Sequence, residues 1–391
     1  MITMEQKKEH SQRKKNPKGQ KLYNIFIGVA VVLAVLLLIN VVSTYNLNST
    51  IKKNQQEAIE KLRPAKIETI ELSDSRCTDC FDISLVTGAL KETNVNITSE
   101  KKILLSSKEG KDLIAKYGIE KLPALIVQGE IGKVTVEIFD KKDDALVFAQ
   151  PAAPYVNVSS NNIVGRVTLY NLKDASCDKC GDLSFMINEI KRTGVKITTQ
   201  KDIDVSSAEG KLLVSKYKIA FAPSIILSKD ADAYAIMKQA WPQIGTKEAD
   251  GSYVMRTPYP PIKNLTSGKM MGLVKLTYLA DKSCAECYDV KTHKLILTSP
   301  QSFALKLDSE ETYDISDAKG KELISRYNIT QVPTVILSND VGVYPSSAAL
   351  KQFFSAEKDG SFVFRKLSVV GAYKDLSSGQ IMNQKQSQQA Q

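Results

Sequence analysis

The sequence predicts an α/β protein with three tandem domains behind a single N-terminal transmembrane helix. The chain has 391 residues, which suits about three domains of ~100–150 residues each. All six cysteines fall in three C-x-x-C pairs at near-equal intervals, and one long apolar run lies near the N-terminus. The pairs are Cys77 with Cys80, Cys177 with Cys180, and Cys284 with Cys287, and each pair marks one repeat.

The apolar run covers residues 22–42 and contains no charged residue. Its length matches the ~20 residues that a helix needs to cross the hydrocarbon core of a bilayer. Residues 1–21 carry seven Lys or Arg and two Glu, a local charge of +5, so the positive-inside bias predicts a cytoplasmic tail and an exported remainder. A cleavable signal peptide is the alternative, but the run is longer than the usual ~7–15 apolar residues of such a peptide.

This topology predicts a single-pass protein of the cell membrane whose cysteines all lie outside the cytoplasm, where disulfides persist. Residues 43–63 mix scattered apolar residues with polar ones, and a short helical stalk and a solvated linker fit that pattern equally well. The net charge is +10, but no basic cluster lies on a predicted folded face, so no nucleic-acid partner is predicted.

The surroundings of the three pairs agree with one another. An alternating apolar and polar run before each pair predicts a strand, and an amphipathic stretch after each pair predicts a helix. We therefore expect the cysteines at a strand-to-helix turn, with the first cysteine near a helix N-terminus that stabilises a thiolate. The alternating runs are residues 67–72, 167–172 and 274–279.

A second shared block lies further along each repeat. A Ser or Asp that can cap a helix precedes apolar residues at helical spacing, and a proline then enters an apolar strand. Repeats two and three also share an Asp-Gly hairpin pattern that repeat one lacks, so repeat one is the one expected to be inert. The helical blocks are residues 107–119, 207–219 and 317–329, and the prolines are Pro123, Pro223 and Pro333.

This order of strand, C-x-x-C pair, two helices and a proline before a further strand resembles the thioredoxin fold. The resemblance covers roughly residues 64–378 and implies a central mixed sheet flanked by helices in each domain. In that family the proline is cis and lies beside the dithiol, where the adjacent backbone can hold an extended peptide. The resemblance thus implies that Pro123, Pro223 and Pro333 position the substrate. The tandem layout is also similar to protein disulfide isomerases.

The predicted domain boundaries follow from these patterns. The last residues are rich in Gln and lack an apolar pattern, which predicts a disordered tail. The expected segments are a basic cytoplasmic tail (1–21), a transmembrane helix (22–42), a stalk or linker (43–63), thioredoxin-like domains (64–160, 161–268 and 269–378) and the tail (379–391).

The chain departs from the family inside the cysteine pairs. No tryptophan precedes any pair, and each intervening dipeptide contains a carboxylate: Asp79, Asp178 or Glu286. A carboxylate beside a thiol raises the thiol pKa by like-charge repulsion. Because Lys179 offsets Asp178, we expect the second repeat to form a thiolate most readily.

An acidic residue also lies two positions after each pair. A carboxylate at the start of a helix is favoured by the helix dipole, and this structural interpretation is preferred to a proton relay. These residues are Asp82, Asp182 and Asp289.

Neither a metal nor an organic cofactor is predicted. A zinc site needs four ligands, whereas each repeat has two cysteines and the only histidines are His10 and His293. No phosphate-binding Gly-rich loop, serine-nucleophile elbow or metalloprotease motif is present.

Two functions fit these observations. The first is a membrane-anchored, extracytoplasmic thiol–disulfide oxidoreductase that acts on protein thiols and disulfides, with a membrane or soluble redox partner. The first cysteine of each pair would form the mixed disulfide, and the second would resolve it. The second is a non-catalytic envelope scaffold or protein-binding array with structural disulfides. A C-x-x-C loop is too short for its closure to stabilise much, which argues against a purely structural purpose.

Overall fold

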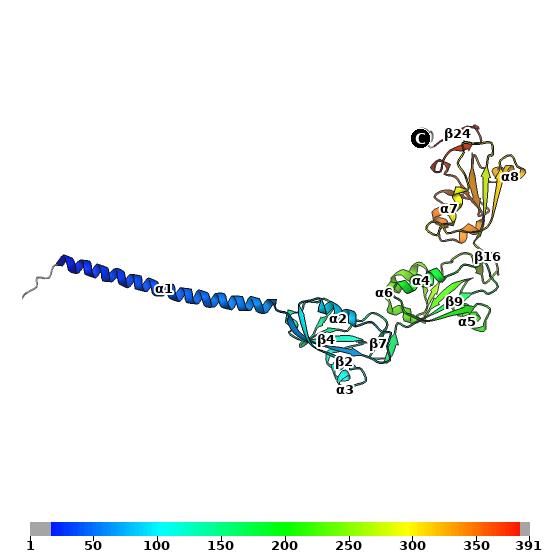
Figure 1. Ribbon diagram of the computed structural model, residues 1–391. Coiled ribbons are helices and arrows are strands. Elements are labelled where there is room, and N and C mark those ends of the chain that lie inside the picture. Colours follow the sequence, from blue (N-terminus) through cyan, green and yellow to red (C-terminus); the bar gives the residue numbers. More distant parts are fainter. Residues whose placement is uncertain (1–16, 384–391) are drawn as a thin grey trace, which may run out of the picture. The chain divides into compact units, whose positions relative to one another are not determined.

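The described chain begins with one long helix. The computed structural model describes residues 17–383, and α1 (Pro17–Leu62) is its first element (Figure 1). Its most apolar window has a mean hydropathy of 2.8 and is not buried, so by length and composition this helix could be a membrane span or a signal anchor. The predicted segment 22–42 lies within α1, and the segment 43–63 is helical up to Leu62. Most of the basic tail, residues 1–16, lies outside the described residues.

Three five-stranded sheets, here called the main sheets, follow α1. Their strand orders are β2-β1-β4-β6-β5, β10-β9-β12-β14-β13 and β18-β17-β20-β22-β21, so the same order recurs in each repeat. In the second and third main sheets the first two strands along the chain are parallel, whereas the remaining neighbours are antiparallel. The predicted α/β class with three tandem mixed sheets is confirmed.

The elements of each repeat follow one plan of strand, helix, strand, helix and antiparallel strands. The first repeat contains β1 (Ala65–Ser73), α2 (Ser84–Lys91), β2 (Val95–Leu104), α3 (Lys108–Tyr117), β4 (Ala124–Gly129), β5 (Asp140–Lys141) and β6 (Ala145–Phe148). The second contains β9 (Val167–Lys173), α4 (Ser184–Arg192), β10 (Ile197–Asp204), α5 (Ala208–Tyr217), β12 (Ser224–Leu227), α6 (Ala235–Ala240), β13 (Gly245–Lys247) and β14 (Tyr253–Met255). The third contains β17 (Leu273–Ala280), α7 (Thr292–Thr298), β18 (Lys306–Asp314), α8 (Ala318–Tyr327), β20 (Thr334–Leu337), α9 (Ser347–Leu350), β21 (Phe354–Ala356) and β22 (Phe362–Phe364).

A three-stranded sheet, here called the small sheet, accompanies each main sheet. The residue before each predicted proline belongs to a small sheet and the residue after it belongs to a main sheet, so the proline joins the two. The small sheets are β3 (Lys121–Leu122), β7 (Tyr155–Asn157) and β8 (Asn162–Val164); β11 (Phe221–Ala222), β15 (Ile262–Asn264) and β16 (Met270–Met271); and β19 (Gln331–Val332), β23 (Tyr373–Asp375) and β24 (Ile381–Met382).

The predicted helix caps are present in two of the three repeats. The Ser107 hydroxyl accepts the Gly110 N–H at 2.9 Å at the start of α3, and Ser207 accepts the Gly210 N–H at 3.0 Å at the start of α5. Such bonds satisfy backbone donors that the first helical turn leaves free. Asp317 forms no side-chain cap at α8, because its carboxylate instead accepts the N–H of Asp314 at 2.9 Å.

Both faces of the second main sheet are buried. Leu169 and Ile225 lie in a cluster with Ile187 of α4. Leu172 lies in a second cluster with α5. This alternation along β9 follows from the period of two that directs successive side chains to opposite faces. Helices therefore cover both faces, as Figure 1 shows.

The C-terminal boundary differs from the prediction. The disordered tail was expected from residue 379, but Ile381 and Met382 form β24 and pair with β23. Two residues are too few to show the alternating pattern of a strand, so the sequence could not indicate that this segment pairs with β23. Residues 384–391 of the predicted tail lie outside the described residues.

The described residues group into two compact units. One contains the chain up to Ile70 together with Leu85–Lys101 and Ile126–Leu146, and the other contains Glu71–Ser84, Lys102–Leu125 and the chain from Val147 onward. The first cysteine pair therefore belongs to the same compact unit as the second and third repeats.

Candidate functional site

Each predicted cysteine pair forms a disulfide just beyond the end of a main strand. The S–S distances are 2.03 Å for Cys77–Cys80, 2.09 Å for Cys177–Cys180 and 2.03 Å for Cys284–Cys287. All six cysteines are half-buried, and no cysteine of the described residues is free. Each disulfide is thus accessible enough to meet a partner thiol.

The helix after each pair begins later than expected. It begins at Ser84, Ser184 and Thr292, several residues beyond the second cysteine of each pair. The effect of a helix dipole falls off within the first turn. The expectation that the first cysteine lies near a helix N-terminus is therefore wrong, and a thiolate needs another source of stabilisation.

The acidic residues after the pairs account for these late helix starts. The Asp82 carboxylate accepts the N–H of Ser84 at 3.0 Å, and Asp182 accepts the N–H of Ser184 at 2.9 Å. Hydrogen bonds from these serines hold the pKa values of Asp82 and Asp182 below their usual range. Asp289 likewise accepts the N–H of Lys291 at 2.9 Å. These contacts support the structural interpretation of the three carboxylates.

The predicted prolines lie beside the dithiols in the first two repeats. A cleft of about 360 Å³ is lined by Cys77, Cys80 and Pro123. A second cleft of about 480 Å³ is lined by Cys177, Cys180 and Pro223. The Cys180 Sγ also lies 3.8 Å from the Ala222 carbonyl oxygen, directly before the proline.

In the third repeat a tyrosine connects the two features. The hydroxyl of Tyr288, the residue after Cys287, donates to the carbonyl of Pro333 at 2.9 Å. The peptide bonds before Pro123, Pro223 and Pro333 are all cis, as the resemblance implied. The structure therefore brings together residues that lie more than 40 positions apart in the sequence.

A buried carboxylate three residues before each pair was missed by the sequence analysis. In the second repeat, Asp174 lies 2.8 Å from the Lys263 ammonium, and in the third, Asp281 lies 2.6 Å from that of Lys374. Burial alone would raise the pKa values of Asp174 and Asp281, but hydrogen bonds from the lysines and neighbouring serines leave them lowered. The repeated D-x-x-C-x-x-C spacing was the signal that could have found them.

In the first repeat a different residue supplies the cation that pairs with this carboxylate. Val156 occupies the position of Lys263 in the small sheet, since β3 pairs Leu122 with Val156 as β11 pairs Ala222 with Lys263. The Asp74 carboxylate instead pairs with Arg76 at 2.5 Å, and that hydrogen bond holds its pKa below the usual range. A cation therefore accompanies the buried carboxylate in every repeat.

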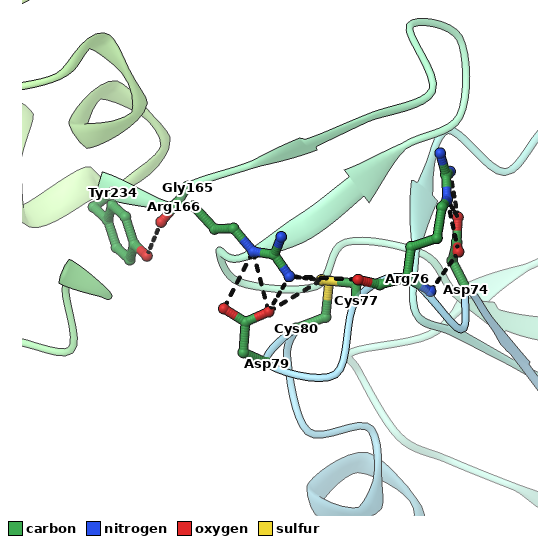
Figure 2. The surroundings of a disulfide bond; sticks show 8 residues. All are labelled: Asp74, Arg76, Cys77, Asp79, Cys80, Gly165, Arg166 and Tyr234. Atoms are coloured by element: carbon green, nitrogen blue, oxygen red, sulfur yellow. Dashed lines mark hydrogen bonds and ion pairs between the residues drawn. A yellow bond between two sulfur atoms is a disulfide. The ribbon is translucent and has the colours of Figure 1, made fainter. Parts of the chain in front are cut away.

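Arg166 lies beside the first dithiol and was also missed. Its guanidinium forms an ion pair with Asp79, the third residue of the first C-x-x-C motif. The Arg166 Nη2 also lies 4.0 Å from the Cys77 Sγ (Figure 2). The hydrogen bond from Arg166 holds the pKa of Asp79 below its usual range. Because 89 positions separate Arg166 from Cys77, no local pattern could have linked them.

The second and third dithiols have different neighbours. The Met270 sulfur of β16 lies beside the second disulfide, 2.9 Å from the Cys177 Sγ and 3.9 Å from the Cys180 Sγ. In the third repeat, Tyr288 also contacts the buried His293, with 3.1 Å between its hydroxyl and Nε2. Burial lowers the pKa of His293 to about 4, so this imidazole is neutral near pH 7.

The metal prediction concerned His293 as well. Among residues 17–383, no group of three or more His, Cys, Asp or Glu is arranged to hold a metal ion. The other histidine, His10, lies outside the described residues.

The strand order and the cysteine positions define a mixed α/β protein with three thioredoxin-like repeats. No protein-family model and no curated protein matches the chain. Among solved structures, the C503A mutant of the alkylhydroperoxide reductase AhpF of Enterococcus faecalis is 13% identical, covers 46% of this chain and 88% of its own, and gives a TM-score of 0.14. ERdj5 form II is 10% identical over 72% of this chain and 39% of its own, with a TM-score of 0.13. Human ERp44 is 10% identical over 76% of this chain and 88% of its own, with a TM-score of 0.14.

These likenesses are too weak to carry an argument about activity. Three closed Cys-x-x-Cys disulfides on such a fold are consistent with a redox role in the broad sense.

Proposed function

We propose that this protein is a membrane-anchored, extracytoplasmic thiol–disulfide oxidoreductase. In the reducing direction, the thiolate of a first cysteine attacks a substrate disulfide and releases one substrate thiol. The second cysteine then attacks the mixed disulfide, which releases the second thiol and closes the cystine. The reverse sequence oxidises a substrate dithiol. The electrons balance within the two sulfur pairs. A membrane or soluble partner then resets the chain, and it acts as a dithiol after the reducing direction and as a disulfide after the oxidising direction.

The observation that carries this proposal is the shared cleft of dithiol and proline. Two half-buried cysteines and Pro223 line one cleft in the second repeat, and the first repeat has the equivalent arrangement around Pro123. A peptide lying in such a cleft has its sulfur within reach of the dithiol. We assign the substrate-positioning role to Pro123, Pro223 and, through Tyr288, Pro333 on this basis.

The membrane anchor is proposed from α1 and the charge beside it. The helix is long and apolar enough to span a bilayer, and seven of the first 21 residues are Lys or Arg. The positive-inside bias then places the cysteines outside the cytoplasm. On intact cells treated with a reductant, a membrane-impermeant maleimide should label the six cysteines. Labelling only after the cells are opened would overturn this topology.

The activity is tested with the full chain in detergent. We expect the chain to reduce insulin with glutathione as the thiol source and to refold a scrambled disulfide substrate. Chains that retain a single pair identify the active repeats, and Cys80→Ser, Cys180→Ser and Cys287→Ser should each trap a mixed disulfide on the first cysteine of that pair.

The matched controls change the first cysteine of the same pair. Cys77→Ser, Cys177→Ser and Cys284→Ser should trap nothing on the remaining cysteine. If no single-pair chain has activity and no mixed disulfide forms, the repeats are a scaffold with structural disulfides, and the proposal is wrong.

A further inference from the structure

Arg166 enters the first dithiol from the segment that leads into the second repeat. Its Nε lies 3.1 and 3.2 Å from the two carboxylate oxygens of Asp79, and its Nη2 contacts the same carboxylate. Asp79 Oδ1 in turn lies 3.8 Å from the Cys77 Sγ, which is 4.0 Å from the arginine. Figure 2 shows the three groups in contact, with Arg166 reaching across from its backbone beside Gly165.

We propose that Arg166 is a positioning residue for the first dithiol, because it neutralises Asp79 and supplies the charge that stabilises the Cys77 thiolate. This rests on the thiol–disulfide exchange proposed above. When the disulfide opens, a negative charge forms on Cys77 at nearly equal distances from one carboxylate and one guanidinium. The two charges oppose each other with similar magnitude, since Coulomb energy depends on distance. Without Arg166, the carboxylate acts alone and disfavours the thiolate.

The other charged groups around Cys77 are already occupied. Arg76 pairs with Asp74, and Glu71 pairs with Lys102 at 3.1 Å. The remaining charges that bear on the dithiol are Asp82, which lines the cleft and accepts hydrogen bonds from Ser84, and Lys196, which acts on Asp79 through space. Among the described residues, Arg166 is thus the cation that contacts both Asp79 and the sulfur.

The backbone beside Arg166 is held firmly. The Tyr234 hydroxyl donates to the Gly165 carbonyl at 2.6 Å, and the Gly165 N–H donates to Asp230 at 3.2 Å. Gly165 has φ +94°, and a Cβ there would lie 2.6 Å from the Ala153 Cβ, so glycine is required. Tyr234 and Asp230 belong to the second repeat, which therefore fixes the group that faces the first dithiol.

The second and third repeats lack this arrangement. Gly272 is bound by Tyr344 and Asp340 just as Gly165 is bound by Tyr234 and Asp230, but the next residue is Leu273 instead of an arginine. The position of Asp79 is also changed to Lys179 in the second repeat. The acid and the base are thus both absent there.

In the third repeat, the acid is present without the base. Glu286 occupies the position of Asp79 and forms no ion pair within the described part of the chain. The ion pair between Arg166 and Asp79 is therefore a feature of the first dithiol alone within the described part of the chain.

The test uses the full chain in detergent with Cys77 as its single cysteine, the other five being changed to serine. The rate of alkylation by iodoacetamide is measured against pH, and its midpoint gives the pKa of Cys77. Arg166→Gln should raise the midpoint by about one unit, which slows alkylation about tenfold at a pH below both midpoints. Asp79→Asn should lower it by a similar amount, because Arg166 then acts unopposed. The double variant should return close to the parent.

Two further variants make the test specific. Arg166→Lys keeps the charge and should restore most of the parent midpoint. In a chain whose single cysteine is Cys284, Arg166→Gln should leave the midpoint unchanged. Far-UV circular dichroism and the fluorescence of Trp241 confirm that each variant remains folded.

Two outcomes would overturn the inference. One is an Arg166→Gln midpoint within about 0.2 units of the parent, and the other is an Asp79→Asn variant that alkylates more slowly. The alkylation rate needs no turnover, so the effect of Arg166 on the Cys77 midpoint and the disulfide exchange tested above can fail separately.

Discussion

Lys263→Val should destabilise the second repeat, because it removes the cation that pairs with the Asp174 carboxylate. The Lys263 ammonium lies 2.8 Å from the Asp174 carboxylate and 2.6 Å from the Ser176 hydroxyl. The side chain of Asp174 is 10% exposed and that of Lys263 is 24% exposed. In Lys263→Val, the carboxylate loses its cation but still accepts the N–H and O–H of Ser176. Valine fits this strand position, since the first repeat carries Val156 there.

The expected loss lies between two limits. Removing one partner of a fully buried ion pair costs about 3–5 kcal/mol, whereas an exposed pair contributes about 0.2–1 kcal/mol. Lys263 is partly exposed, and Asp174 keeps its two bonds from Ser176, so the loss should be about 2 kcal/mol. If the free energy of unfolding falls by about 2 kcal/mol for each molar of urea, the urea midpoint of unfolding should fall by about 1 M.

The assay uses the only tryptophan of the chain as its reporter. Trp241 lies in the second repeat, is 2% exposed, and packs edge-on against Tyr253. Its fluorescence therefore follows the unfolding of the second main sheet in urea. Arg192→Gln is the matched control, because the Arg192–Glu189 pair is exposed and its loss should cost less than about 0.5 kcal/mol.

The effect should depend on pH in a defined direction. Burial raises the pKa of Asp174, but hydrogen bonds from Lys263 and Ser176 lower it by more, so it lies below its usual value. A carboxyl group with a lowered folded-state pKa stabilises the protein above its unfolded pKa of about 3.9 and loses this contribution as pH falls through the folded value. The difference in unfolding free energy between Lys263→Val and the parent should be largest at pH 7 and should become smaller below about pH 4.

A rescue is available from the first repeat. Ser176 lies two positions after Asp174, as Arg76 lies two positions after Asp74. Adding Ser176→Arg to Lys263→Val should therefore recover roughly half of the lost unfolding free energy. An unchanged midpoint in Lys263→Val at pH 7, or a difference of equal size at pH 7 and pH 3, would refute the reasoning.

Three further predictions concern the neighbours of the second and third dithiols. By NMR, the His293 ring should titrate near pH 4 because burial disfavours its charged form, and the third repeat should lose stability as pH falls from about 6.5 to 4; a midpoint above 6 would contradict this. Met270→Ala should speed reduction of Cys177–Cys180 by dithiothreitol about two- to threefold, because the thioether that lies against both cysteine sulfurs is removed; an unchanged rate would show that Met270 does not hinder attack on the disulfide. Gly181→Ala should destabilise the second repeat by about 1–3 kcal/mol in the Trp241 assay, because its Cβ would lie 2.6 Å from the Tyr259 carbonyl oxygen; a stable variant would be evidence against that close approach.

The sequence by itself determined the elements that depend on neighbouring residues. The alternating run of residues 167–172 lies in β9, and the Ser207 cap starts α5, because strand periodicity and capping each involve only a few consecutive positions. The cysteine spacing likewise determined the disulfides, since two residues separate the partners in every pair. The repetition of these local patterns was enough to predict three α/β repeats.

Only the tertiary structure decided what surrounds each dithiol. Arg166 reaches Cys77 and Lys263 reaches Asp174 across about 90 positions, and these meetings depend on how the small sheet pairs and packs. The late helix starts were also missed, because an aspartate side chain that bonds the backbone leaves no hydrophobic period to detect. Charges act through space and not along the chain, so three similar cysteine motifs acquire different environments only when the chain is folded.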